Sequence, residues 1–274
     1  MLESIAVMFS YGFMARAFIV GILTSLCLAL LGVSLVLKRY SMIGDGLSHV
    51  GFGAVAVAMA LGAAPLAVAV PVVMIAAFLL LMISDDGSFR GDAAVAVISS
   101  SALAIGVMSA SLSSGINSDV HSYLFGSVLA MSKSDVMLSV AVSVAVLLLY
   151  VICYNRIFAI TFDETFGRAT GLKVDKYNTL LAMLTAVTVV VGMRMMGALL
   201  ISSLVIFPAL SAMRVFSSFR SVVICSALVS AVGFCIGIAA SYWLNTPAGA
   251  SVVIANLVIF LTFSTVGAVL KTNE

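Results

Sequence analysis

Long runs without a charged residue dominate the chain, and short polar segments separate them. Each run is long enough for one or two membrane-spanning helices, since a span needs roughly 20 apolar residues. Two of the runs contain a turn signal of their own, at Gly62 to Pro65 and at Asn245 to Gly249. The runs cover residues 17–37, 46–84, 93–118, 136–155, 178–193, 195–213 and 221–270, with Arg194 splitting two of them. The pattern predicts about nine spans, or about eight if one shorter run is re-entrant.

Composition agrees with this pattern. Of the 274 residues 63% are hydrophobic and only 9% are charged, against roughly 25% charged in a soluble domain. The mean hydropathy is +1.28. We therefore predict an all-α fold, a polytopic transmembrane helical bundle in the cell membrane, with residues 1–274 forming a single membrane domain. The net charge of +2 gives no reason to expect a nucleic-acid partner.

Basic residues favour alternate loops, which sets the orientation through the positive-inside rule. One set of loops contains ten Lys and Arg residues: Lys38, Arg39, Arg90, Arg156, Arg168, Lys173, Lys176, Arg214, Arg220 and Lys271. The opposite set contains Arg16, Lys133 and Arg194. The bias predicts that the first set of loops and the C-terminus are cytoplasmic.

The longest cytoplasmic loop, residues 155–178, has the signals of a short helix. Thr161 and Glu164 fit a capping box, and Gly171 fits a helix stop, which leaves a helix of about nine residues between them. Phe162 and Phe166 are four residues apart and are expected to share a face. This helix either packs on the chain's own inner ends or fits a groove on a partner. The chain has no GxxxxGK[ST] phosphate loop, so active transport needs an ion gradient or a separate ATPase.

The stretch SMIGDGLSHVGFG, residues 41–53, places an Asp and a His in an apolar run. Asp45 and His49 are four residues apart and share a helix face, with Ser48 beside them and four glycines around them. An ionisable group at membrane depth costs about 2.5–3.5 kcal/mol, which suggests a use. Three uses stay open: a hydrogen bond that locks two helices, a proton relay, or a transit site for zinc, manganese or iron.

Other candidate residues carry weaker signals. Asp119 and His121 lie in an outer loop, where they either meet an incoming metal ion or form an ordinary polar loop. Met193, Met195 and Met196 surround Arg194; thioethers suit copper(I), but Met in an apolar chain usually packs.

Several stretches resemble the permease subunits of ATP-binding-cassette importers for zinc, manganese and iron, whose fold is of the type II importer class. They follow one another in order over most of the chain: LVLKRYSMIGDGLSHVGFGAVAVAMALG, SYLFGSVLAMSKSDV, YNRIFAITFDETFGRATGL, VGMRMMGALLISSLVIFPALSAMR and SYWLNTPAGAS. The resemblance implies that Asp45 and His49 lie in the metal path. It also implies that residues 160–172 form the coupling helix that docks on the ATPase, with Phe162, Asp163, Glu164, Phe166, Arg168 and Gly171 as its partner-binding residues.

The resemblance further implies an assembly of two permease copies, two cytoplasmic ATPase subunits and an outer metal-binding protein. The chain is then a transport subunit and not an enzyme, and the divalent metal is its cargo and not a resident cofactor. The GDGLSH form favours zinc, with manganese or iron as alternatives. A proton-coupled secondary metal carrier, which needs no ATPase, is the alternative of another class.

Overall fold

The computed structural model describes residues 12–85, 91–113, 123–124, 126 and 133–272. All regular structure in these residues is helical, as the sequence predicts. The helices in chain order are α2 (Gly12–Leu37), α3 (Ser41–Ala60), α4 (Pro65–Asp85), α5 (Gly91–Leu112), α7 (Lys133–Ile152), α8 (Tyr154–Phe162), α9 (Glu164–Ala169), α10 (Val174–Met196), α11 (Ala198–Val215), α12 (Phe219–Leu244) and α13 (Ala248–Thr272).

Eight of these helices are long and apolar enough to cross a membrane, and α11 is a shorter apolar helix. The two turns expected inside the longest apolar runs are present between α3 and α4 and between α12 and α13. The break expected at Arg194 is misplaced, because α10 continues through this residue to Met196. The chain breaks instead at Gly197, whose φ of +87° lies in the region that glycine adopts without steric cost.

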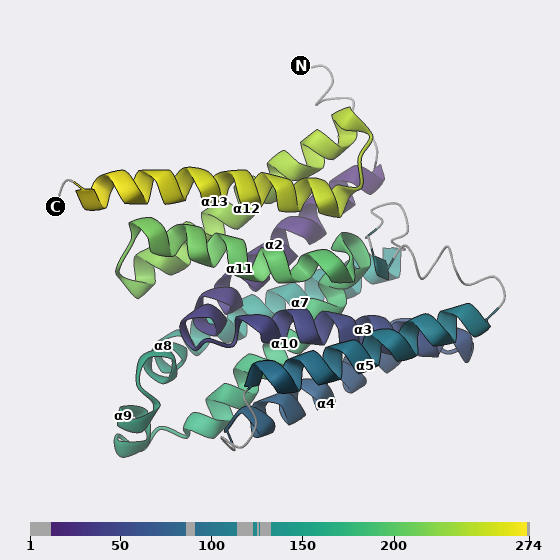
Figure 1. The fold of residues 1–274 in the computed structure, drawn as a ribbon, viewed down its shortest axis with the longest axis horizontal. Helices are drawn as coiled ribbons and strands as arrows, with labels where there is room; N and C mark the ends of the chain where they lie inside the picture. Colours follow the sequence, from purple (N-terminus) through teal and green to yellow (C-terminus); the bar gives the residue numbers. More distant parts are fainter. Residues whose placement is uncertain (1–11, 86–90, 114–122, 125, 127–132, 273–274) are drawn as a thin grey trace.

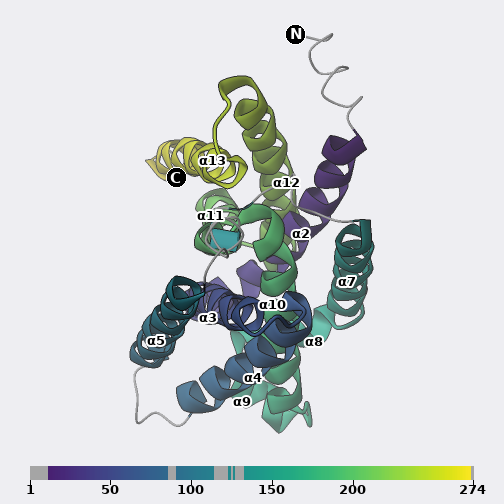
Figure 2. The same cartoon turned by 90° about the vertical axis from the view of Figure 1, so that its right-hand side faces the viewer.

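The long helices run in alternating directions along the bundle (Figure 1). One end carries the α2–α3 turn, α8, α9 and the C-terminus, and we call it the inner end. Helices α2, α3 and α10 are mostly buried, whereas α5, α7 and α13 expose most of their length. Figure 2, turned by 90°, shows α5, α7 and α13 at the periphery, around the more central helices. The predicted metal-path helix is therefore one of the core helices.

Glycines allow the core helices to approach closely. A Cβ on Gly32 of α2 would lie 2.1 Å from the Val205 carbonyl oxygen of α11. A Cβ on Gly53 of α3 would lie 2.5 Å from the Ala102 carbonyl oxygen of α5. Backbone atoms cannot move aside as a flexible side chain can, so both crossings need a residue without a Cβ.

A second pair of glycines lies where α10 meets α11. Gly126 has a φ of +79° and faces the backbone at the end of α10. A Cβ on it would lie 2.5 Å from the Met195 carbonyl oxygen and 2.8 Å from the Gly197 nitrogen. Gly126 and Gly197 thus pack backbone against backbone, both with positive φ.

The short helix expected in the inner loop is present, but its start differs from the prediction. Thr161 does not cap it: Thr161 lies inside α8 and donates a hydrogen bond to the Ile157 carbonyl oxygen at 2.7 Å. The cap of α9 is Asp163, whose carboxylate accepts a 2.8 Å hydrogen bond from the Phe166 backbone N–H. The expected stop is correct, because α9 ends at Ala169 and Gly171 follows with a φ of +82°.

Candidate functional site

A tight turn of three residues leads from α2 into α3. Arg39 adopts a φ of +62°, which is uncommon for a residue with a Cβ. The Tyr40 N–H donates to the Leu35 carbonyl oxygen at 2.8 Å, and the Arg39 N–H donates to the Val36 carbonyl oxygen at 3.1 Å. This pair of bonds is the Schellman pattern that closes helix ends. These bonds therefore end α2 and hold the residues that lead into α3 in a defined conformation.

Asp45 and His49 lie on one face of α3, as their spacing predicts. The His49 Nε2 atom is 3.5 Å from the Asp45 Oδ2 atom, and the two side chains are 15% and 30% exposed. Ser48 does not join them: it is buried, and its hydroxyl donates to the Asp45 backbone carbonyl at 2.7 Å. At 1.5 Å of rise per residue, Asp45 is about 6 Å and His49 about 12 Å from the start of α3. The pair therefore lies in the inner part of the span.

Helices α11, α5 and α10 are among those that meet α3 around this pair. Ser202 of α11 faces the Asp45 carboxylate. Gly46 faces Val95 of α5, with 2.8 Å between a Cβ on the glycine and the valine Cγ1. A Cβ on Gly51 would lie 3.3 Å from the Met193 sulfur of α10. The glycines of the GDGLSHVGFG stretch thus allow neighbouring helices to pack closely against the segment that carries the polar pair.

The chemistry of the pair suits transient binding of a cation. Among the described residues, no group of three or more His, Cys, Asp or Glu side chains lies close enough to hold a metal ion. The Nδ1 atom of His49 is buried and has no hydrogen-bond partner within this part of the chain. One carboxylate and one imidazole are too few ligands for a tight closed site, where four are usual for zinc. They fit a site that an ion enters and leaves.

Phe162 and Phe166 do not share a helix face as expected, because the chain breaks at Asp163 and the two residues lie on different helices. Phe162 belongs to α8 and packs on Phe158 and Phe219, with ring centroids 5.0 and 5.8 Å apart. Phe166 belongs to α9 and is 65% exposed. Phe162 is itself 58% exposed, so both aromatic side chains are open to another molecule.

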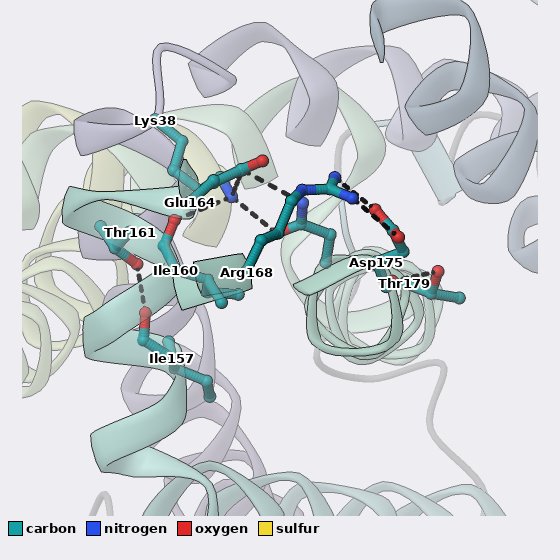
Figure 3. Close-up of polar contacts among 9 residues, drawn as sticks. Lys38, Ile157, Ile160, Thr161, Glu164, Arg168, Asp175 and Thr179 are labelled. Carbon is teal, nitrogen blue, oxygen red and sulfur yellow. Dashed lines mark hydrogen bonds and ion pairs between the residues drawn. The ribbon is translucent and has the colours of Figure 1, made fainter. Parts of the chain in front are cut away.

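The charged residues of α9 attach it to the bundle. Glu164 Oε1 lies 2.5 Å from the ammonium nitrogen of Lys38, at the end of α2. Arg168 pairs with Asp175 of α10 at 2.6 Å, and both of these side chains are more than half exposed. Figure 3 shows the two ion pairs, Glu164 with Lys38 and Arg168 with Asp175. Sequence reasoning counted Lys38 only as an orientation signal and missed its contact with Glu164.

The remaining candidates have separate outcomes. Asp119 and His121 lie outside the described residues, so their proposed role in meeting the metal stays a prediction.

Met193, Met195 and Met196 are buried in the core. Arg194 forms an ion pair with Asp135 of α7, and its guanidinium carbon lies 5.9 Å from the centre of the Tyr123 ring. The positions of Met193 and Ser202 beside α3 could not be read from the sequence, because they come from other helices.

A bundle that includes eight described helices long and apolar enough to cross a membrane, with Asp45 and His49 inside one of them, is that of a multi-pass membrane protein. Comparison with known proteins identifies the family: the profile of the ABC 3 transport family matches residues 10–267, and the chain belongs to this family. It is thus a permease of the ATP-binding-cassette metal-importer class.

Individual relatives differ in the metal that they are named for. The chain is 28% identical to the manganese import system permease protein ScaB of Streptococcus gordonii, over 94% of this chain and 93% of the relative. It is 30% identical to the high-affinity zinc uptake system membrane protein ZnuB of Haemophilus influenzae, over 89% and 94% of the two chains. Among solved structures it is similar to PsaBC from Streptococcus pneumoniae in complex with a Fab, with a TM-score of 0.86, 28% identity and coverage of 96% and 94%. The two named relatives thus both belong to metal uptake systems, one for manganese and one for zinc.

Proposed function

We propose that this chain is the permease subunit of an ATP-driven importer whose cargo is a divalent transition-metal ion, with zinc preferred over manganese and iron. The observation that carries the proposal is the pair Asp45 and His49, which lies on a buried helix in the inner part of a span. Imidazole is a common ligand of zinc, whereas calcium and magnesium prefer oxygen ligands. The pair therefore favours borderline transition metals over the alkaline-earth ions.

In this mechanism the two side chains have different roles. The Asp45 carboxylate offsets the positive charge of the ion as the ion loses part of its hydration shell. The His49 imidazole supplies the nitrogen that distinguishes transition metals from harder cations. Because the chain contributes few ligands, the ion is bound weakly enough to leave toward the inner end.

The proposal includes partners. A separate cytoplasmic ATPase supplies the energy and docks on α9, where Phe166 is open and Arg168 is exposed. An outer metal-binding protein delivers the ion. Two copies of the chain form the membrane unit, so that residues 1–274 act as one permease domain and the path between the copies meets two Asp45 and two His49 side chains.

The test is metal uptake into proteoliposomes that contain the permease, its ATPase and the metal-loaded binding protein. Radiolabelled zinc and manganese are supplied separately, each with and without ATP. We expect ATP-dependent uptake that is faster for zinc, and a fall of at least about tenfold for zinc in His49→Ala, which matches one lost ligand interaction of 1.4 kcal/mol or more. Asp45→Asn is expected to reduce uptake of both metals.

A matched control is Met42→Ala, which lies on α3 less than one turn before Asp45 and is 47% exposed. We expect it to transport at the wild-type rate. Wild-type zinc uptake in His49→Ala would contradict the role of the imidazole. Uptake driven by a pH gradient in liposomes that lack the ATPase would instead identify a proton-coupled carrier.

A further inference from the structure

Lys38 is a buried cation at the inner end of α2, and all of its donors are used within the chain. Its side chain is only 6% exposed. The ammonium group donates to the Glu164 carboxylate at 2.5 Å, to the Asn178 side-chain oxygen at 2.6 Å and to the Ile160 carbonyl oxygen at 3.2 Å. An ammonium group has three N–H donors, so its hydrogen-bonding capacity is filled. Lys38 is thus held in one position and is not available to a partner.

The network around Lys38 closes on itself (Figure 3). The Asn178 side-chain nitrogen donates to the same Glu164 oxygen at 3.1 Å, and Asn178 is 3% exposed. The three side chains come from α9, from the end of α2 and from α10. Lys38 and Asn178 are buried and Glu164 is 34% exposed, so a displacement of Glu164 leaves a desolvated ammonium group and a desolvated amide without their shared partner. A movement of α9 therefore has to move α2 and α10 or break these bonds.

Two routes lead from this network to the metal-path residues. The first is the α2–α3 turn: Lys38 is followed by two residues and then by α3, and the Schellman bonds of the turn exclude free rotation at this joint. The second is α10, which carries Asn178 near its start and Met193 near its end, against Gly51 of α3. Both routes consist of helix backbone and buried contacts, which transmit displacement better than a flexible loop does.

We propose that Lys38 is the positioning residue that transmits movement of α9 to α3 and α10, and so ties ATP hydrolysis in the partner to movement of the metal ion past Asp45 and His49. The inference rests on the proposed function, since it needs an ATPase on α9 and an ion beside α3. Lys38 touches neither of them. It acts through Glu164 and Asn178 on one side and through the α2–α3 turn on the other.

The experiment measures the number of ATP molecules hydrolysed per metal ion imported, in proteoliposomes with the complete complex and zinc as the probe. Lys38→Met keeps the length of the side chain and removes its charge and donors. We expect it to assemble with the ATPase and to hydrolyse ATP, but to spend about three to ten times more ATP per ion, as the loss of one coupling interaction predicts. Lys38→Arg restores charge and donors, and we expect its ratio to return to within about twofold of wild type.

The second variant, Asn178→Leu, removes the α10 acceptor and leaves the pair of Lys38 with Glu164 in place. It is buried, so it cannot act by direct contact with the ATPase, and a raised ratio is expected here as well. If Lys38→Met does not assemble with the ATPase, the ratio of ATP to imported ion in Asn178→Leu tests the proposal instead. The matched control is Asp175→Asn, which removes the exposed ion pair between the same two helices, α9 and α10. We expect the wild-type ratio in this variant.

The outcomes separate the inference from the function on which it rests. If the wild-type complex imports no metal with ATP, the proposed function fails. If the wild type imports metal and Lys38→Met or Asn178→Leu keeps the wild-type ratio of ATP to ion, the proposed role of Lys38 is wrong. A raised ratio that Lys38→Arg does not lower would also count against it, because a general packing defect then explains the loss.

Discussion

Arg194, near the end of α10, forms an ion pair with Asp135 in the first turn of α7. The two side chains are only 22% and 12% exposed. The charge that interrupts the apolar sequence is thus neutralised inside the protein by a residue from another helix. This pairing explains why α10 continues through Arg194 and why a charge in an apolar run did not mark a helix end.

Removal of one partner of this pair is expected to destabilise the protein. Asp135→Leu leaves a largely buried guanidinium without its carboxylate, at a cost of about 2 kcal/mol for a pair that keeps some solvent contact. The measurement is the thermal denaturation midpoint of the purified protein in detergent. The double variant Asp135→Leu with Arg194→Met removes both charges and should recover part of the loss; no recovery would show that the two residues do not act as a pair.

The crossing of α3 with α5 depends on Gly53. We expect Gly53→Val to destabilise the bundle by about 2 kcal/mol or more, because its Cβ would meet the Ala102 carbonyl oxygen and the backbone of α5 would have to move. Thermal denaturation and the yield of folded protein report this change. The matched control is Gly12→Ala at the start of α2, where an added Cβ has no atom within 4 Å among the described residues. An equal loss in both variants would contradict the packing argument.

The turn at Arg39 stores backbone strain that glycine would relieve. Arg39→Gly and Arg39→Ala both remove the exposed charge and differ only in the Cβ. With a φ of +62° at this position, we expect the glycine variant to be more stable than the alanine variant by about 1 kcal/mol. Comparison of the two denaturation midpoints isolates the conformational effect, and equal midpoints would mean that the turn carries no strain.

The cap of α9 is a local feature with a local effect. Asp163→Ala removes the acceptor for the Phe166 N–H, which costs about 1 kcal/mol of helix stability. Because α9 has only six residues, we expect it to fray and the ATPase to bind several times more weakly, with little change in the denaturation midpoint of the bundle. The binding constant of the detergent-solubilised permease for its ATPase is the measurement. Thr161→Val serves as the control, and a larger effect there would restore Thr161 as the cap.

The sequence predicts the spans and the proximity of Asp45 and His49 because both depend on local information. The length of an apolar run predicts a span, and the residue types from Gly62 to Pro65 are typical of a turn. Asp45 and His49 are four residues apart on one helix, so their proximity follows from helix geometry. The glycines around them predict close packing, although not the helices that pack there.

The features that the sequence missed depend on contacts between distant segments. Thr161 and Asp163 are both good capping residues, and the contact of Glu164 with Lys38 fixes α9 in a position that the local pattern does not define. Ser202 reaches Asp45 from α11, and nothing near Ser202 in the sequence indicates this. A charged residue next to or inside an apolar run nevertheless indicates a buried ion pair. Lys38 and Arg194 were both interpreted only as orientation charges, and each has a carboxylate partner in the fold.

The contact of Gly126 with Gly197 has a consequence for how the protein can vary. Each residue has a positive φ, and a side chain on Gly126 would meet the backbone that leads into Gly197. Substitution of one member cannot be compensated by a change in the side chain of the other, since neither has a side chain to shorten. In a saturation library selected for metal uptake, these two positions should therefore stay invariant together, even though neither takes part in the chemistry of transport.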